Sequence, residues 1–336
     1  MTPRRRFGRQ DLSFRERSIG RRRLRSHRRC TITLIGTDAK RQAHMEISRS
    51  SDRRWTATTG NSKRGMPSAG PIKLVAIDLD GTLLTSSKRV SEQTLNALRC
   101  LRPDVRVVIA SARPPRSVRP IYQLLALDTW MINYNGALIW DEPGRQPVFH
   151  QPMSGALARQ IIQTARDMFE QVLVSCEAMD RWFTDRADDP AYTTETGRLF
   201  APDVVEPYQR FCQNQITKLM LLGPPPMLAR LEPVLLDRFG HLVTILHADE
   251  HLLQIMDRRV SKAAALAMVA EFYQVSRDQI MAIGDAPNDV GMLQYAGIAV
   301  AMDNAHPIVK QNAHWVAPSN DDHGVHAALV RYGLCR

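Results

Sequence analysis

Cysteine is scarce in this sequence and has no functional spacing. Five cysteines are scattered along the chain, without a CxxC pair or an arrangement typical of zinc ligands: Cys30, Cys100, Cys176, Cys212 and Cys335. This pattern excludes a disulfide framework and a zinc finger, and it suits a reducing compartment. We therefore predict a cytoplasmic protein.

Long hydrophobic runs and glycine-rich nucleotide motifs are also missing. No stretch approaches the ~18 to 20 uninterrupted apolar residues of a membrane-spanning helix, so we expect no membrane partner. No Walker-type or Rossmann-type glycine pattern is present either. Hydrophobic residues nevertheless make up 44% of the chain, which is enough to build real cores. The 336 residues suffice for two domains of ordinary size.

Negative charge is scarce only in the first fifth of the chain. Residues 1–70 hold 19 Lys and Arg but 5 Asp and Glu, a net charge of +14. Residues 71–336 hold 26 Lys and Arg and 29 Asp and Glu, a net charge of −3. The overall charge of +11 therefore describes one terminal segment. Because the remainder is mildly acidic, it gives no reason to expect nucleic acid as a partner.

The basic segment 1–70 has little apolar periodicity and its charges repel one another, so we expect it to be disordered. Three explanations of it are open: a basic arm for nucleic acid or anionic lipid, an organellar transit peptide, or upstream sequence read through from a misplaced start. We favour the third, with Met66 or Met45 as the true initiator, since the globular pattern begins a few residues after Met66. Mass spectrometry of the native N-terminus distinguishes these explanations.

Buried strands and amphipathic helices alternate after this segment. The aliphatic runs 73–77, 105–113 and 130–140 are typical of strands buried on both faces. Between the first two, Ser91 is a suitable N-cap for a helix with one leucine-rich face. Strand, helix and strand at these spacings predict parallel βαβ units, and hence an α/β fold with a Rossmann-like, doubly wound parallel sheet.

The pattern changes between residues 153 and 250, where helix and hairpin patterns with apolar faces of their own follow one another. The α/β pattern then resumes with an expected helix at 262–274 and a buried strand at 279–285. We therefore predict a core domain formed by 71–152 and 251–336, with an α+β cap domain inserted at 153–250. A site between two such domains is a common place for a small ligand.

The pentapeptide Asp78-Leu79-Asp80-Gly81-Thr82 ends the first expected strand. In open α/β sheets, ligands bind beyond the carboxyl ends of the strands. Two carboxylates two residues apart, followed by a glycine for a tight turn, can hold a hard cation and offer a nucleophile. An ordinary turn with solvated acids is the alternative when the pentapeptide is considered alone.

Three further polar groups are expected at the same edge of the sheet. Ser111 ends the second strand, where a hydroxyl and the following N–H groups can grip a phosphoryl oxygen. Lys262 begins a helix and offers a cation for the same oxygens. Asp285 ends a later strand, with Asn288 and Asp289 on the loop behind it. The convergence of these groups favours a phosphoryl site over a solvated turn.

This set of motifs resembles the haloacid dehalogenase (HAD) superfamily, and within it the Cof-type hydrolases, which carry a large α+β cap. The resemblance covers residues 71–336 and rests on six motifs in this order: DLDGTLL at 78–84, IASARP at 109–114, YNGALIWD at 134–141, VSKAAAL at 260–266, GDAPNDVGML at 284–293 and VAMDNA at 300–305. It implies a phosphatase with a HAD-like core.

The resemblance also implies roles for individual residues. Asp78 would be the nucleophile and Asp80 the general acid and base, while Ser111 and Lys262 would hold the phosphoryl group. The Mg²⁺ ligands would be Asp78, the carbonyl of Asp80, and Asp285. Asn288 and Asp289 would support the metal loop. Because Asp80 must be protonated to release an alcohol, we expect the carboxylates around it to raise one pKa of the group.

Two positions depart from the usual pattern of the family. Ser111-Ala112-Arg113 stands where Thr-Gly-Arg is usual, which keeps the hydroxyl. Pro287 stands in the metal loop, where the family often has an acidic residue. Neither change removes a functional atom, so we expect activity to be retained.

Substrate contacts are predicted at Asn135 and Gly136, which end the third expected strand, and at Arg113; a plain turn is the alternative for Asn135 and Gly136. In the cap, Glu177, Arg181 and Trp182 belong to an expected hairpin, which we predict to be solvated rather than turned toward the cleft.

The sequence therefore predicts a Mg²⁺-dependent phosphatase that hydrolyses a small phosphorylated metabolite through an aspartyl-phosphate. The candidate substrates are a sugar phosphate, FMN or another nucleotide-type compound, and pyridoxal phosphate. A phosphomutase or a dedicated sugar-phosphate phosphatase with the same cap is a near alternative. The alternative of another class is a nucleic-acid-binding or regulatory protein that acts through the basic arm.

Overall fold

The computed structural model describes residues 71–186 and 195–335 of the chain. The predictions about the basic segment 1–70 lie outside these residues. None of the helices in the described part is long and apolar enough to span a membrane.

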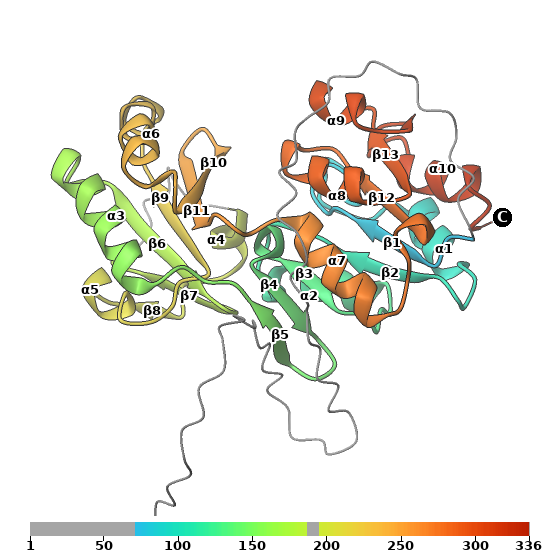
Figure 1. The fold of residues 1–336 in the computed structure, drawn as a ribbon, viewed down its shortest axis with the longest axis horizontal. Coiled ribbons are helices and arrows are strands. Elements are labelled where there is room, and N and C mark those ends of the chain that lie inside the picture. Colours follow the sequence, from blue (N-terminus) through green and yellow to red (C-terminus); the bar gives the residue numbers. More distant parts are fainter. Residues whose placement is uncertain (1–70, 187–194, 336) are drawn as a thin grey trace, which may run out of the picture. The chain divides into compact units, whose positions relative to one another are not determined.

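A five-stranded parallel sheet carries the strand ends predicted to bear the chemistry (Figure 1). Its order is β14-β13-β12-β1-β2. Strand β1 is central because it pairs in parallel with β12 on one side and β2 on the other. All of its residues are buried, as the sequence LVAI requires of a strand covered on both faces. The bounds are β1 (Leu74–Ile77), β2 (Arg106–Ile109), β12 (Ile280–Gly284), β13 (Ile298–Met302) and β14 (Trp315–Ala317).

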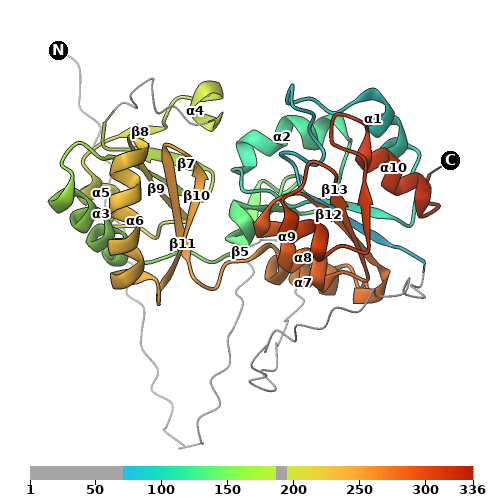
Figure 2. The ribbon, with the colours of Figure 1, turned by 90° about the horizontal axis from the view of Figure 1, so that it is seen from above.

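Helices cover both faces of this sheet. Figure 2 shows α1, α2 and α10 on one face and α7, α8 and α9 on the other. The predicted cap of α1 is present, since the Ser91 hydroxyl accepts a hydrogen bond from the Thr94 amide at 3.3 Å. This layered arrangement confirms the doubly wound α/β core. The bounds are α1 (Glu92–Arg99), α2 (Pro115–Leu124), α7 (Lys262–Phe272), α8 (Val290–Tyr295), α9 (Pro307–Gln311) and α10 (Gly324–Arg331).

The prediction of one strand over 130–140 is wrong. The segment forms two antiparallel strands, β3 (Met131–Asn133) and β4 (Leu138–Asp141), and β5 (Gln146–His150) completes a small three-stranded sheet. The short 3₁₀ turn between β3 and β4, Tyr134–Gly136, reverses the chain because its three residues have φ angles of 50°, 56° and 100°. The aliphatic residues on both sides conceal this break, although an Asn-Gly pair is itself a turn signal.

A six-stranded sheet, β10-β11-β9-β6-β7-β8, follows in the chain. Helices α3 and α6 pack together over one of its faces (Figure 1). The predicted boundary at residue 250 falls between two paired strands of this sheet and is therefore too early; the rest of the domain division stays a prediction. The bounds are α3 (Gly155–Met168), β6 (Leu173–Ala178), β7 (Arg181–Thr184), α4 (Glu195–Leu199), β8 (Val204–Val205), α5 (Tyr208–Phe211), β9 (Lys218–Leu222), α6 (Pro225–Phe239), β10 (Val243–Asp249) and β11 (Leu252–Asp257).

Strand alternation gives the cap sheet two different faces. In β6, Val174 and Cys176 belong to the apolar cluster under the helices, whereas Glu177 is on the opposite side. The prediction that the β6–β7 hairpin is solvated is wrong for Glu177 and Trp182, which are 1% and 3% exposed, whereas Arg181 is exposed as predicted.

Candidate active site

Asp78 directly follows the central strand and is anchored through its backbone. Its amide donates to the carbonyl of Ile283 in β12 at 3.0 Å, and its carbonyl accepts from the Leu83 amide at 3.2 Å. The side chain is buried at the carboxyl edge of the parallel sheet. Asp78 therefore occupies a rigid position at the place where ligands bind in this class of fold.

Lys262 connects Asp78 with the loop after β12. Its ammonium group donates to Asp78 Oδ1 at 2.5 Å and to Asp289 Oδ1 at 2.7 Å, and all three side chains are buried. Burial by itself lowers the pKa of Lys262, but the negative charges of Asp289 and Asp78 outweigh it and raise that pKa above its ordinary value. The lysine is therefore a permanent cation beside Asp78.

Three carboxylates crowd together at this point. Asp78, Asp285 and Asp289 each offer an oxygen atom, and these atoms lie within 4.8 Å of one another. Burial, reinforced by the charge of Asp289, raises the pKa of Asp78 well above its ordinary value. Burial also raises the pKa of Asp285. Such a crowded anionic group, with a single lysine between two of its members, suits a divalent cation with oxygen ligands.

The loop 284–289 is organised by Asp289, whose second carboxylate oxygen accepts from the amides of Asp285 and Ala286, both at 3.0 Å. Both oxygens of Asp289 are therefore held by the protein, as expected for a supporting residue. Asn288 donates to Asn135 Oδ1 at 2.8 Å, while its own Oδ1 is buried and has no hydrogen-bond partner in the described part of the chain. A buried oxygen without a donor fits a cation ligand, so the residues present are compatible with Mg²⁺.

Gly81 gives Asp285 the space that it occupies. Its φ of +79° is a left-handed conformation, and a Cβ atom there would lie 2.3 Å from Asp285 Oδ2. The hydroxyl of Thr82 donates to Asp285 Oδ1 at 2.8 Å. The pentapeptide after β1 thus orients the carboxylate at the end of β12. Thr82 is therefore a site residue, and the sequence motif gave no indication of its role.

Asp80 does not join the three crowded carboxylates. Arg113 donates to its two oxygens at 2.6 and 2.5 Å, and Lys88 donates to Oδ1 at 2.9 Å. Although burial raises the pKa of Asp80, the hydrogen bonds and charges of Arg113 and Lys88 lower it below its ordinary value. We expected one carboxylate of the group around Asp80 to have a raised pKa. The pKa values of Asp78 and Asp285 are raised, whereas that of Asp80 is lowered. Sequence patterns contained no signal for Lys88.

Ser111 lies buried at the end of β2 and is tied to the turn after β3. Its hydroxyl oxygen accepts from the Arg113 amide at 3.1 Å, which leaves the hydroxyl proton available to a ligand. Its carbonyl accepts from the Asn135 amide at 3.0 Å. Gly136 approaches the start of α7 so closely that a Cβ atom would lie 2.3 Å from the Ser261 carbonyl oxygen. The structure thus brings the predicted residues on four strand or helix ends into one region, with Arg113 turned to Asp80.

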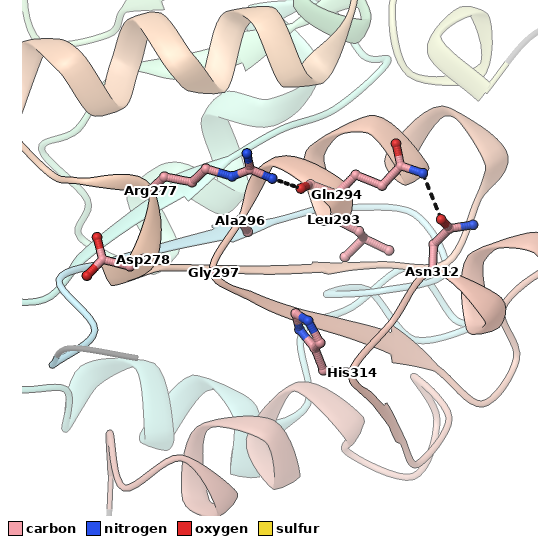
Figure 3. Close-up of a pocket in the computed structure, with 8 residues that line it drawn as sticks. All are labelled: Arg277, Asp278, Leu293, Gln294, Ala296, Gly297, Asn312 and His314. Atoms are coloured by element: carbon pink, nitrogen blue, oxygen red, sulfur yellow. Dashed lines mark hydrogen bonds between the residues drawn. The ribbon is translucent and has the colours of Figure 1, made fainter. Parts of the chain in front are cut away.

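A cavity of about 360 Å³ lies elsewhere in the core (Figure 3). Gln294 donates to Asn312 at 2.7 Å across its rim. Asp278 and Gly297 precede β12 and β13, so this cavity is at the amino ends of the strands, opposite the edge that carries Asp78. It is lined by Arg277, Asp278, Leu293, Gln294, Ala296, Gly297, Asn312 and His314.

Comparison with known proteins agrees with this geometry. The family model of haloacid dehalogenase-like hydrolases matches residues 75–329. The chain belongs to this family. The match confirms the predicted HAD membership, and with it an enzyme with a hydrolase fold.

Named relatives of this HAD protein are phosphatases. The 5-amino-6-(5-phospho-D-ribitylamino)uracil phosphatase YitU of Bacillus subtilis is 30% identical over 271 residues, which cover 77% of this chain and 97% of the relative. The HMP-PP phosphatase of Citrobacter koseri is 28% identical over 236 residues, which cover 70% of this chain and 85% of the relative. A haloacid dehalogenase-like hydrolase from Bacteroides thetaiotaomicron superposes with a TM-score of 0.70 at 26% identity, covering 77% of this chain and 99% of that one.

Proposed function

We propose that this HAD protein is a Mg²⁺-dependent phosphatase that hydrolyses a small phosphorylated metabolite through a phosphoryl-enzyme formed on Asp78. The observation that carries the proposal is the buried Lys262 ammonium, which holds Asp78 and Asp289 at the carboxyl ends of two adjacent strands. Relatives that act on phosphorylated metabolites support the substrate class. A cytoplasmic location stays a prediction from the cysteine spacing.

In the first half of the reaction, an Asp78 oxygen attacks phosphorus and the bond from phosphorus to the leaving oxygen breaks. Asp80 gives its proton to that oxygen, and the alcohol leaves. Lys262 and the Ser111 hydroxyl hold the oxygens of the phosphoryl group as it transfers. In the second half, Asp80 takes a proton from a water molecule, whose oxygen attacks the acyl phosphate, releases inorganic phosphate and restores the Asp78 carboxylate.

Asp80 must change partners to act as an acid. In the structure Arg113 and Lys88 pair with its carboxylate and lower its pKa, which disfavours the protonated form. The proposed mechanism therefore requires the Asp80 carboxylate to leave these cations when substrate binds. Since its side chain is 39% exposed, it lies where such a movement meets little packing.

Mg²⁺ would be held by Asp78, Asp285 and the Asp80 carbonyl, with Asn288 and Asp289 in support. When bound, it supplies positive charge that offsets the repulsion between a carboxylate nucleophile and a phosphate dianion. The crowded carboxylates and the unpaired Asn288 oxygen are the observations that favour this assignment.

The direct test compares Asp78→Asn with the wild-type chain on an aryl phosphate in the presence of Mg²⁺. We expect turnover to fall at least about a thousandfold while the fold is retained, because asparagine keeps the shape but removes the nucleophile. Asp237→Asn, an exposed change on α6, is the matched control and should be fully active. Activity retained by Asp78→Asn contradicts the assignment. Release of an isomerised phosphate ester in place of free phosphate would favour the mutase alternative.

A further inference from the structure

A cluster of buried and half-buried charges joins helix α2 to the β6–β7 hairpin. Arg116 donates to both carboxylate oxygens of Glu177 at 2.7 and 2.8 Å. Its amide also donates to Asp180 Oδ1 at 2.9 Å, and Arg119 donates to Asp180 Oδ2 at 3.1 Å. The Tyr134 hydroxyl donates to the Met179 carbonyl at 2.6 Å. Each acid of the hairpin therefore already has an arginine partner.

Two donors in this cluster are left over. Lys218, which stands opposite Glu177 in the register of β6 and β9, is 4% exposed and makes no hydrogen bond within the described residues. Its ammonium group lies 5.2 Å from the centre of the Tyr134 ring. The Nε atom of Arg116 is also buried and has no acceptor among residues 71–186 and 195–335. Native proteins rarely leave a buried donor unpaired, so the Nε atom of Arg116, together with the Lys218 ammonium group, points to an acceptor that binds between them.

Tyr134 connects these donors with the proposed phosphoryl site. Lys218 and Arg116 both interact with the charge of Glu177, and Lys218 lies over Tyr134. The next residue, Asn135, is bonded to the Ser111 carbonyl and to Asn288. A substrate whose phosphate is held by Ser111 would thus extend its leaving group toward Lys218.

We propose that Lys218 and Arg116 form a second anion-binding subsite, which receives a carboxylate or a second phosphate group at the far end of the substrate's leaving group. This inference rests on the proposed function and specifies its substrate class as esters with two anionic ends. Charge-assisted hydrogen bonds from an ammonium and a guanidinium are the strong ones that such a group requires. Burial lowers the pKa of Lys218 to about 8, with Glu177 opposing the shift, and a bound anion would favour its charged form.

The test uses three series of phosphonates as competitive inhibitors of aryl phosphate hydrolysis by the full chain. One series ends in a methyl group, one in a carboxylate and one in a second phosphonate, each with two to six methylene groups. We expect one of the two anionic series to bind at least about tenfold more tightly than the methyl series at its best length. Which anionic series gains identifies the chemical group.

The preference should depend on Lys218. Lys218→Met keeps an unbranched apolar side chain and should remove the tenfold preference while leaving inhibition by the methyl series unchanged. Lys218→Arg should restore part of it. Lys73→Met is the matched control, because Lys73 is exposed before β1 at the opposite edge of the sheet, and it should keep the full preference.

Two outcomes overturn the inference: no anionic series gains at any length, or the gain persists in Lys218→Met. If Lys218→Met does not fold, as judged by circular dichroism, Lys218→Gln serves in its place. If the wild-type chain hydrolyses no aryl phosphate, the proposed function fails instead. The subsite is then tested by calorimetric titration of the same phosphonates, where equal binding of all series would refute it.

Discussion

The ammonium group of Lys262 lies 2.5 Å from Asp78 Oδ1, although 184 residues separate the two in the chain. Asp78 follows β1, the first strand of the core, and Lys262 begins α7, the helix that precedes strand β12 of the same sheet. Their contact places a buried cation beside the proposed nucleophile. It also makes the stability of the core depend on charges that we propose to serve catalysis.

Removal of this cation should destabilise the protein. Lys262→Met leaves Asp78 and Asp289 buried without their partner, so we expect the free energy of unfolding to fall by about 3–5 kcal/mol. Adding Asp289→Asn should recover part of this loss, because it removes one of the uncompensated charges, but it should not recover activity. Urea denaturation measures the first effect and aryl phosphate hydrolysis the second. Equal stabilities of the single and double variants would refute the charge argument.

The carboxylate of Asp285 should set the requirement for metal. We expect chelation with EDTA to remove activity and Mg²⁺ to restore it. In Asp285→Asn, one charged ligand of the group is lost, so half-maximal activity should need about 10 to 100 times more Mg²⁺. The Mg²⁺ titration of initial rates gives this ratio, and Asp237→Asn should titrate like the wild-type chain. An unchanged titration would remove Asp285 from the ligand set.

Gly81 should be intolerant of even one methyl group. In Gly81→Ala the new Cβ atom would lie 2.3 Å from Asp285 Oδ2, so the carboxylate must move, and activity should fall more than about tenfold. Gly333→Ala is the matched control: Gly333 also has a positive φ, +68°, but nothing lies within 4 Å of the added atom. Its cost should be the backbone strain alone, about 1 kcal/mol, with full activity. Equal activities of the two variants would contradict this role of Gly81.

His150 should make stability fall in mild acid. It bonds to the Thr217 hydroxyl at 2.8 Å, and burial lowers its pKa from 6.5 to about 4. Between these pH values the unfolded chain binds a proton that the folded one does not. The stabilisation is therefore complete above pH 6.5 and is lost as pH falls toward 4, by about 2–3 kcal/mol in all.

Urea denaturation at several pH values checks this linkage. His150→Gln keeps a hydrogen-bonding group but does not titrate, so its free energy of unfolding should change less between pH 6.5 and 4 than that of the wild-type chain. Parallel pH profiles for the two chains would show that His150 does not carry the effect.

The positions of most proposed site residues could be predicted from the sequence. Asp78, Ser111 and Asp285 each follow an aliphatic run that must be buried, and the carboxyl ends of parallel strands meet at one edge whatever their side chains are. Local patterns therefore sufficed for the core fold and for the residues gathered at that edge.

The charge pairs could not be predicted in this way. Whether Asp80 meets Arg113 or the other carboxylates depends on where side chains from distant segments lie, and hydrophobic periodicity contains no information about that. The same holds for Glu177, which looks like a solvated hairpin residue until Arg116 of α2 is found against it.

The sequence alone determined the α/β core and the set of residues at the carboxyl edge of the sheet, because these follow from burial and from strand order. Its six motifs indicated the family. Only the tertiary structure decided which charges neutralise one another, where the chain reverses at Tyr134–Gly136, and that Lys218 keeps an unused donor. The physical reason is that burial patterns are local properties of the chain. Electrostatic free energies depend on distances between residues that the fold brings together.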